Sequence, residues 1–311
     1  MIQYFTRRVL QLIPVLIGIS VIVFLLLRLI PGDPADIMLG DRGTAEAREQ
    51  IREALGLNKP IHEQYFLFLK RVITGDLGDS FVLRQPAADV IRERFPRTLF
   101  LSLYGVIMSA IIAIPIAMIS ALKKDTIIDQ GIRGLVTLTL AMPNFWIALI
   151  LIIAFSIRLH LFPIAGYGDN FIEHLYYLFL PALSIALAGS AILVRNLRAT
   201  ILDILLSDYV RTAHSKGLRS QTVFTRHVLR NSLISTVTLL GLRVAYSVGG
   251  AIIIETVFAI PGLGRLLLNS ISTRDYPMVQ AITLFLAFLV VFVNLLTDLL
   301  YAVVDPRVKY A

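Results

Sequence analysis

Histidine side chains are the first candidates for metal binding or general acid–base chemistry in this chain. The five histidines are widely separated, and no two lie at the spacing of a metal-ligand pair. They are His62, His160, His174, His214 and His227. The chain has no cysteine, which excludes a disulfide framework, a thiolate zinc site and a thiol nucleophile. We therefore predict no metal site and no resident cofactor.

Motifs for hydrolysis and nucleotide binding are also absent. The chain has no Gly-x-Ser-x-Gly elbow, no His-Glu-x-x-His pair and no hydrophobic segment with paired carboxylates. It also lacks the P-loop pattern Gly-x4-Gly-Lys-Ser/Thr. We predict no catalytic residue, although an intramembrane enzyme stays a minor alternative. Any ATP-driven activity would need its ATPase on another chain.

The composition indicates a membrane protein. Of 311 residues, 57% are hydrophobic and only 16% are charged, against about 25% charged in soluble domains. A membrane helix needs about 20 mostly apolar residues. Six segments satisfy this requirement, and we predict an all-α integral membrane protein with six transmembrane helices. The segments are Val9–Ile30, Leu99–Leu122, Leu135–Ile157, Leu178–Val194, Leu233–Phe258 and Val279–Val304.

The distribution of basic residues predicts the orientation of these spans. With a cytoplasmic N-terminus, the segments 1–8, 123–134, 195–232 and 305–311 face the cytoplasm and hold 14 basic and five acidic residues. The opposite loop, 31–96, holds nine basic and eleven acidic residues. Positive charge accumulates on the cytoplasmic side of membrane proteins. The pattern therefore favours both termini inside, and it explains the net charge of +8 without nucleic acid.

The external loop 31–96 carries signals for short helices. Thr44 can cap a helix that runs through Leu55 and ends at Gly56, and Pro60 can open another that closes near Gly75. This layer either shields the membrane helices or contacts an external partner.

The cytoplasmic segment 195–232 holds the most informative pattern. Ser207 is a candidate N-cap, Asp208 suits the positive start of a helix, and Gly217 suits a left-handed C-cap. A second helix opens at Ser220 and leads into the fifth span. So short and polar a helix is not stable alone. It is either a solvated turn or an element that enters a cleft in a partner protein.

Residues 208–218 closely resemble the EAA-loop of permease subunits of ABC importers, in the branch that handles dipeptides, oligopeptides and nickel. The resemblance covers nearly the whole chain, which would form a single permease domain, 1–311. Other motifs that carry it are Ile30–Pro34, Leu55–Pro60, Gly75–Gly78, Met142–Trp146, Glu255–Phe258, Pro261–Gly264, Arg274–Pro277 and Asp305–Arg307. Two positions depart from the pattern: Arg211-Thr212-Ala213 replaces Glu-Ala-Ala, and Ser235 replaces a proline.

The resemblance implies a type I ABC importer permease in the bacterial inner membrane. Its partners would be a second permease, either another chain or a second copy, two cytoplasmic ATPases that bind ATP and Mg²⁺, and an extracytoplasmic solute-binding protein. It also implies that loop 195–232 couples to the ATPases. The candidate coupling residues are Asp208, Tyr209, Arg211, Thr212, Ala213, Lys216 and Gly217.

The solute path and the solute are less determined by sequence. Arg243 lies near the middle of the fifth span, where a charge must face protein or water. It would contact a solute carboxylate, or pair with Asp298 or a partner subunit. Asn144 and Glu255 are further path candidates, and Glu255 would bind a backbone amide. A peptide is the first choice of solute, with glutathione or a nickel chelate as alternatives. An ion-coupled secondary transporter and a structural scaffold are rival classes.

Overall fold

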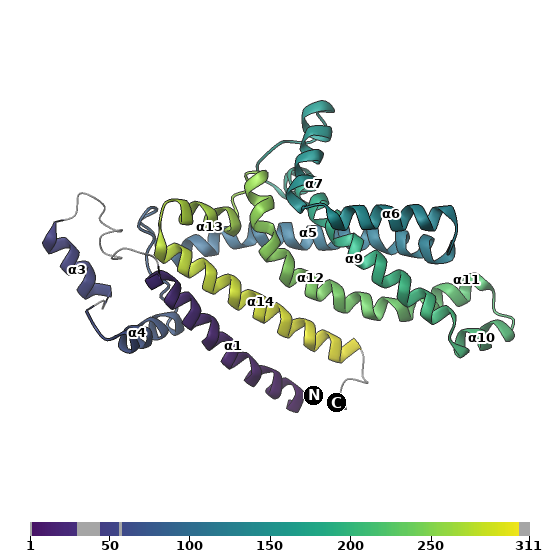
Figure 1. Ribbon diagram of the computed structural model, residues 1–311, viewed down its shortest axis with the longest axis horizontal. Helices are drawn as coiled ribbons and strands as arrows, with labels where there is room; N and C mark the ends of the chain where they lie inside the picture. Colours follow the sequence, from purple (N-terminus) through teal and green to yellow (C-terminus); the bar gives the residue numbers. More distant parts are fainter. Residues whose placement is uncertain (1, 30–43, 56–57, 305–311) are drawn as a thin grey trace. The chain divides into compact units, whose positions relative to one another are not determined.

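The computed structural model describes residues 2–29, 44–55 and 58–304 (Figure 1). These residues form helices and loops, as the predicted all-α class requires, and the β-structure among them is one isolated bridge between Asp79 and Pro86. The chain divides into two compact units, Met1–Pro96 with Gly262–Val291 and Arg97–Pro261 with Phe292–Ala311. The predicted helix end at Gly56 and the motifs 30–34 and 305–307 lie outside the described residues.

The first unit combines the N-terminal helices with α13. Tyr65 and Phe68 of α4 (Ile61–Ile73) pack against Phe24 of α1 (Ile2–Leu29). The Tyr65 hydroxyl lies 2.8 Å from the Ser20 hydroxyl of α1. A second apolar cluster joins α5, α13 and α14. The elements are α1 (Ile2–Leu29), α3 (Ala45–Leu55), α4 (Ile61–Ile73), the first part of α5 (Ala87–Leu122), α13 (Leu263–Ser272) and the first part of α14 (Tyr276–Val304).

The two short helices predicted in loop 31–96 are confirmed. One starts directly after Thr44, and the other has Pro60 at its N-cap. Gly75 follows the end of α4 with φ +82°, and its N–H donates to the Val72 carbonyl while the Asp76 N–H donates to Arg71. This is the Schellman arrangement, which needs a left-handed residue at the glycine position.

Asp275 organises the turn that precedes α5. Its carboxylate, buried in the first unit, accepts hydrogen bonds from the Ser80 hydroxyl and from the Phe81 and Val82 amides. It also accepts from the Met278 amide at the start of α14, as an N-cap residue does. One carboxylate therefore satisfies several polar groups from segments almost 200 residues apart in the chain.

The second unit surrounds α9. This helix contacts α6, α7 and α12, and residues along most of its length are buried. The elements are the rest of α5, α6 (Ile127–Ala141), α7 (Asn144–Leu151), the π-helix η2 (Ile152–Arg158), α8 (Phe171–Tyr177), α9 (Phe179–Leu205), α10 (Asp208–Ser215), α11 (Ser220–Thr222), the π-helix η3 (Val223–Leu229), α12 (Arg230–Val257) and the end of α14.

The predicted third span, Leu135–Ile157, lies in a bent pair of helices. The chain bends by 106° between Ile127–Ala141 and Asn144–Arg158, which together form either one broken span or a re-entrant loop. Met142, at the break, has extended angles of φ −89° and ψ 131°. A residue before proline is disfavoured in the α conformation, and Pro143 has no N–H to continue the helix.

The other predicted spans coincide with helices. By length and composition α5, α9 and residues Tyr276–Leu299 of α14 are able to cross a membrane, and two bent pairs would raise the number to five. The second pair, Ser220–Val244 with Gly249–Val257, bends by 62°. In α1 the apolar part is shorter, Leu10–Leu25. The count of six spans and their orientation stay predictions.

An ion pair links α6 to α9. Arg198 Nε and Nη2 donate to the two carboxylate oxygens of Asp129 at 2.8 and 2.6 Å. Ser120 at the end of α5 donates to the same carboxylate at 2.6 Å, and the Asp125 amide donates at 3.1 Å. Asp129 is fully buried. Paired donors of this kind give both attraction and a defined orientation.

We expect Asp129→Asn to lower the free energy of unfolding by about 3 kcal/mol, because Arg198 would lose its charged partner in a largely buried place. Thermal unfolding of the purified protein in detergent would measure this change. In the double variant Asp129→Leu with Arg198→Met, no charge is left without a partner, so most of the loss should disappear. A double variant less stable than Asp129→Asn would contradict this account.

We expect Asp275→Ala to lower the free energy of unfolding by about 2 kcal/mol, because it removes a helix cap and leaves the buried Ser80 hydroxyl without its carboxylate acceptor. Asp79→Ala, at an exposed position of the same turn, is the matched control and should change stability little. Denaturation followed by intrinsic fluorescence would compare the two. Equal effects of both substitutions would refute the role of Asp275.

Candidate functional site

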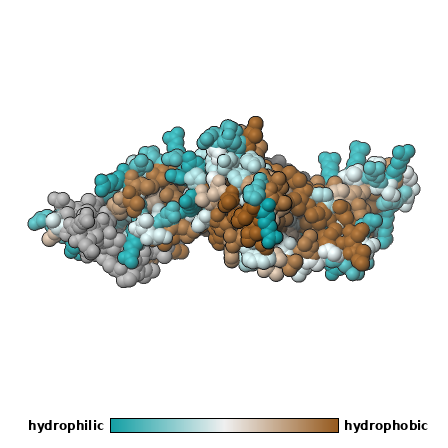
Figure 2. Space-filling model, turned by 90° about the horizontal axis from the view of Figure 1, so that it is seen from above, coloured by the Kyte–Doolittle hydropathy of each residue, from teal (hydrophilic) through white to brown (hydrophobic). Residues whose placement is uncertain are grey.

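The segment after α9 forms a compact helical loop at one end of the second unit. Within it α10, α11 and η3 follow one another and lead directly into α12. Over the second unit, Figure 2 shows a broad brown hydrophobic surface that gives way to teal side chains at the end where α10 and α11 lie. A polar loop beside a hydrophobic surface is what a membrane protein presents to water.

The predicted helix at Asp208 is confirmed, but its capping differs in detail. Ser207 occupies the N-cap position, yet its hydroxyl donates backward to the Ile204 carbonyl at 2.6 Å and makes no capping bond. The Ser207 hydroxyl therefore bonds to the last turn of α9 and not to the first turn of α10. Asp208 remains at the positive end of the helix, where a negative charge is favourable.

The backbone at the end of α10 favours glycine. Gly217 has φ +76°, its N–H donates to the His214 carbonyl at 2.9 Å, and the Leu218 N–H donates to the Ala213 carbonyl at 3.4 Å. These two bonds define a Schellman motif, in which residues with a Cβ are strained at the glycine position. The left-handed C-cap predicted at Gly217 is confirmed.

Two side chains of α10 hold it against the second unit. Val210 and Ala213 lie three residues apart, on one helix face, and are 2% and 9% exposed. They pack in one cluster with Leu197 and Ile201 of α9 and with Val223 of η3. The Tyr209 hydroxyl adds a polar link, because it accepts a hydrogen bond from the Asn231 amide group at 3.2 Å. These contacts join α10 to the apolar cluster of α9 and η3 and to the start of α12.

The other candidate coupling residues lie on the exposed side of α10. The side chains of Asp208 and Arg211 are 100% and 73% exposed, and their contact at 4.0 Å contributes little to stability. Thr212 and Lys216 are also exposed. Ala213 is the exception, because it belongs to the packed face. The exposed charges are thus available to another molecule.

Two leucines beside α10 complete this surface and were not among the candidate residues. Leu206 is 71% exposed just before the helix, and Leu218 is 41% exposed just after it. Tyr209 is also half-exposed, so the loop presents apolar as well as charged side chains. Aromatic side chains are enriched in protein interfaces. The sequence alone did not indicate that these leucines are exposed, because single leucines in a polar segment are as compatible with burial as with exposure.

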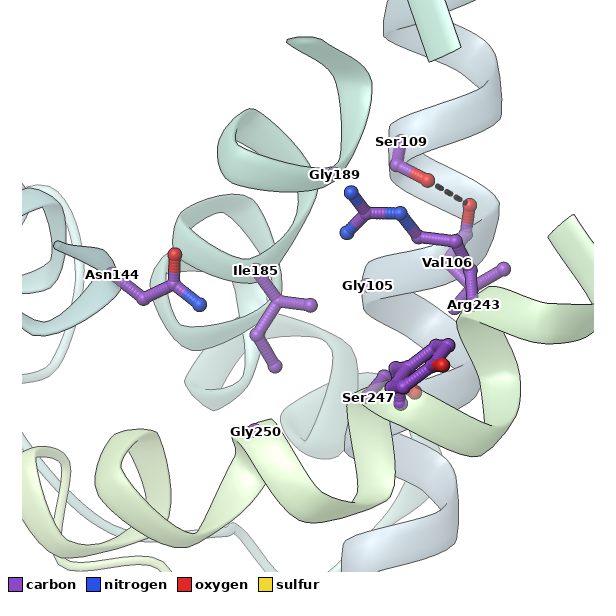
Figure 3. A pocket seen from close by; sticks show the side chains of 10 residues that line it. Gly105, Val106, Ser109, Asn144, Ile185, Gly189, Arg243, Ser247 and Gly250 are labelled. Atoms are coloured by element: carbon purple, nitrogen blue, oxygen red, sulfur yellow. Dashed lines mark hydrogen bonds between the residues drawn. The ribbon is translucent and has the colours of Figure 1, made fainter. Parts of the chain in front are cut away.

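A cavity of about 160 Å³ lies between α5, α7, α9 and α12 of the second unit. It brings together two of the three predicted path residues, Asn144 and Arg243 (Figure 3). The remaining lining residues are small, polar or aliphatic: Gly105, Val106, Ser109, Ile185, Gly189, Tyr246, Ser247 and Gly250. Tyr246 is 76% exposed, so the cavity opens to the surface of the chain.

Arg243 extends along this cavity toward α9. Figure 3 shows its guanidinium group beside Gly189 and Ser109. A Cβ atom on Gly189 would lie 3.2 Å from Arg243 Nη1, so glycine leaves the space that the guanidinium group uses. Among the described residues, no ion pair joins Arg243 to the sequence candidate Asp298.

Glu255 lies elsewhere in the second unit and is not part of the cavity lining. Its carboxylate is fully buried and accepts a hydrogen bond from the Thr98 hydroxyl of α5 at 2.6 Å. The predicted contact of Glu255 with a backbone amide stays a prediction. The geometry separates Glu255 from Asn144 and Arg243, and its place in a solute path stays a prediction.

Known proteins resemble this chain over its whole length. It is 40% identical over 316 residues to the oligopeptide transport system permease protein AppB of Bacillus subtilis, with 100% of both chains covered. It is 37% identical to the dipeptide transport system permease protein DppB of Escherichia coli K12, covering 100% of this chain and 99% of the relative. It is 38% identical to the glutathione transport system permease protein GsiC of Pectobacterium atrosepticum, with 100% of both chains covered.

A solved structure shares the fold. A chain of the MetNI methionine ABC transporter, in an inward-facing conformation, superposes with a TM-score of 0.59 at 12% sequence identity. The superposition covers 70% of this chain and 96% of that chain. At so low an identity the likeness concerns the fold alone, and it confirms the predicted type I importer permease class.

Family profiles cover both parts of the sequence. Residues 1–102 match the N-terminal membrane component of binding-protein-dependent transport systems. Residues 113–310, which include α10 and the cavity residues from α7, α9 and α12, match the description "binding-protein-dependent transport system inner membrane component". The chain belongs to this family of inner membrane transport permeases.

Proposed function

We propose that this chain is the permease subunit of an ABC importer that passes di- or oligopeptides across the inner membrane. The observation that carries this proposal is the full-length similarity to oligopeptide and dipeptide permeases. ATP hydrolysis takes place on partner subunits, and this chain contributes the path and the mechanical connection. It has no catalytic role of its own.

The packing of α10 supports a mechanism for that connection. Its apolar face contacts α9 and η3, while its charged face and the leucines beside it are exposed. A cleft in a cytoplasmic ATPase would receive the exposed face. When the ATPases close on ATP, α10 moves with them, and the packed Val210 and Ala213 pass the displacement to α9 and α12. Its exposed charges orient the contact more than they strengthen it.

The complete importer contains further subunits. A second permease, either a homologous chain or another copy of this one, forms the path together with this chain. Two ATPases bind ATP and Mg²⁺ on the cytoplasmic side, and a solute-binding protein delivers the peptide on the other side. The helices α3 and α4 belong to the predicted external loop, where the binding protein would dock.

Glutathione is the second candidate solute, because a glutathione permease is 38% identical over the full length. Glutathione and a dipeptide both offer carboxylates and amide groups, so one permease surface suits either. A nickel chelate is a further alternative within the same branch. An ion-coupled transporter belongs to a different class and would work on an ion gradient without ATP.

We expect the double variant Arg211→Ala with Lys216→Ala to lower ATP-driven uptake at least tenfold, because loss of both positive charges on α10 would weaken correct docking of the ATPase. Uptake of a labelled dipeptide into proteoliposomes with binding protein and ATP would measure this. Both side chains are exposed, so thermal stability should stay unchanged.

The matched control is Lys123→Ala with Lys124→Ala, which removes the same charge at exposed positions outside α10. This control should transport normally. Equal loss of uptake in both double variants would show a general charge effect and would contradict the coupling role of α10. Uptake driven by an ion gradient in the absence of ATP would overturn the importer proposal itself.

We expect Gly217→Ala to destabilise the end of α10 by about 1 kcal/mol, because alanine is strained at φ +76°. Gly217→Asn should be milder, since asparagine tolerates this conformation. No atom lies within 4 Å of a Cβ built at Gly217 or at Gly131, so Gly131→Ala is the steric control in an α-helix. Uptake should fall slightly in Gly217→Asn and further in Gly217→Ala. Normal uptake by Gly217→Ala would show that this cap is not needed for coupling.

A further inference from the structure

We propose that the cavity between α5, α7, α9 and α12 binds the carboxylate group of the transported solute, with Arg243 as its main ligand. The inference rests on the proposed function, because it specifies which group of the peptide this chain contacts. The four observations behind it are the position of Arg243, the space beside Gly189, the charge balance of the lining and the size of the cavity.

The position of Arg243 demands a partner. The residue lies in the middle of a predicted span, where an arginine costs about 2.5–3.5 kcal/mol unless protein or water compensates. Among the described residues, Arg243 makes no hydrogen bond and no ion pair. Arg198, by contrast, lies at the far end of α9 and is fully engaged by Asp129. The two arginines therefore serve different purposes, and only Arg243 is open to a mobile ligand.

The space around the guanidinium group suits a planar anion. Gly189 and Ser109 flank it, and a Cβ on Gly189 would lie only 3.2 Å from Nη1 and 3.2 Å from Ser109 Cβ. The glycine thus keeps open the side of the cavity into which Arg243 extends (Figure 3). A guanidinium group presents parallel N–H donors that match the two oxygens of a carboxylate.

The lining favours negative charge. It contains one arginine and no aspartate or glutamate. The hydroxyls of Ser109 and Ser247 donate to the Val106 and Val244 carbonyls, so their protons are already used. Asn144 and Tyr246 are left as additional donors. A cationic group would find one repelling charge here, whereas an anion finds several donors.

The size of the cavity restricts what enters it. Pockets that enclose a whole drug-sized ligand measure about 300–1,000 Å³. At about 160 Å³ this cavity accommodates one end of a peptide, and the remainder would lie outside it. The exposed Tyr246 marks the open side. We therefore assign the cavity to the C-terminal carboxylate of the peptide and its last residue.

The test is direct binding of tritiated Ala-Ala to the purified complex, without ATP and without binding protein, so that selection by the binding protein is removed. N-acetyl-Ala-Ala retains the carboxylate and should compete with the label. Ala-Ala amide lacks the charge and should compete at least tenfold more weakly, because a charge-assisted hydrogen bond contributes more than a neutral one.

Variants of the chain identify the ligand. Arg243→Gln should weaken Ala-Ala binding at least tenfold, and Arg243→Lys should retain part of it, since lysine keeps the charge but not the paired donors. Gly189→Ala should give an intermediate loss by displacing the guanidinium group. Arg133→Gln, at an exposed position of α6, removes the same charge far from the lining residues and should bind normally.

Three outcomes would overturn the subsite: equal competition by the amide and the acetylated peptide, unchanged binding in Arg243→Gln, or no binding to the native complex. If Arg243 instead pairs with a partner subunit, Arg243→Gln will dissociate the complex in size-exclusion chromatography, which also overturns it. ATP-driven uptake of the same dipeptide is measured in parallel. If the native complex transports the dipeptide and Arg243→Gln changes neither binding nor uptake, only the subsite is refuted. If the native complex shows no ATP-driven uptake, the proposed function is refuted.

Discussion

The contact between Arg198 and Asp129 is the interaction on which the end of the second unit beside α10 depends. It joins α9 to the first turn of α6, and the Ser120 hydroxyl brings the end of α5 to the same carboxylate. A buried carboxylate is stable only when its partners are complete. Because Asp129 is fully buried and has four donated hydrogen bonds, the three helices are held in one relative position.

That position provides the surface on which α10 packs. Leu197 and Ile201, on either side of Arg198 along α9, belong to the apolar cluster that receives Val210 and Ala213. An eight-residue helix has little stability of its own, so this packing and the Schellman cap at Gly217 define where it lies. The exposed residues of α10 are thereby held in a defined position relative to α9.

Charges in the second unit are treated in two contrasting ways. Asp129 and Arg198 satisfy each other within the chain, and buried Glu255 is held by Thr98. Arg243 extends into a cavity that contains donors but no acid. Groups that stabilise the fold have their partners in the same chain, while a group that handles a solute must leave a place for it. The presence or absence of a hydrogen-bond partner within the described part of the chain, more than burial alone, distinguishes Arg243 from the structural pairs.

Local patterns in the chain account for much of what the structure contains. Hydrophobic segments, the Thr44, Pro60 and Gly75 signals, and the sequence from Ser207 to Gly217 locate helices and their ends, because capping and backbone preferences act over a few residues. Long-range relations were beyond such patterns. The pairing of Asp129 with Arg198 and the presence of Asn144 and Arg243 in one cavity lining depend on contacts between distant segments. Even the Ser207 hydroxyl is directed by the preceding helix. Helix positions follow from neighbours in sequence, whereas partners and cavities follow from packing, which decides which polar groups meet.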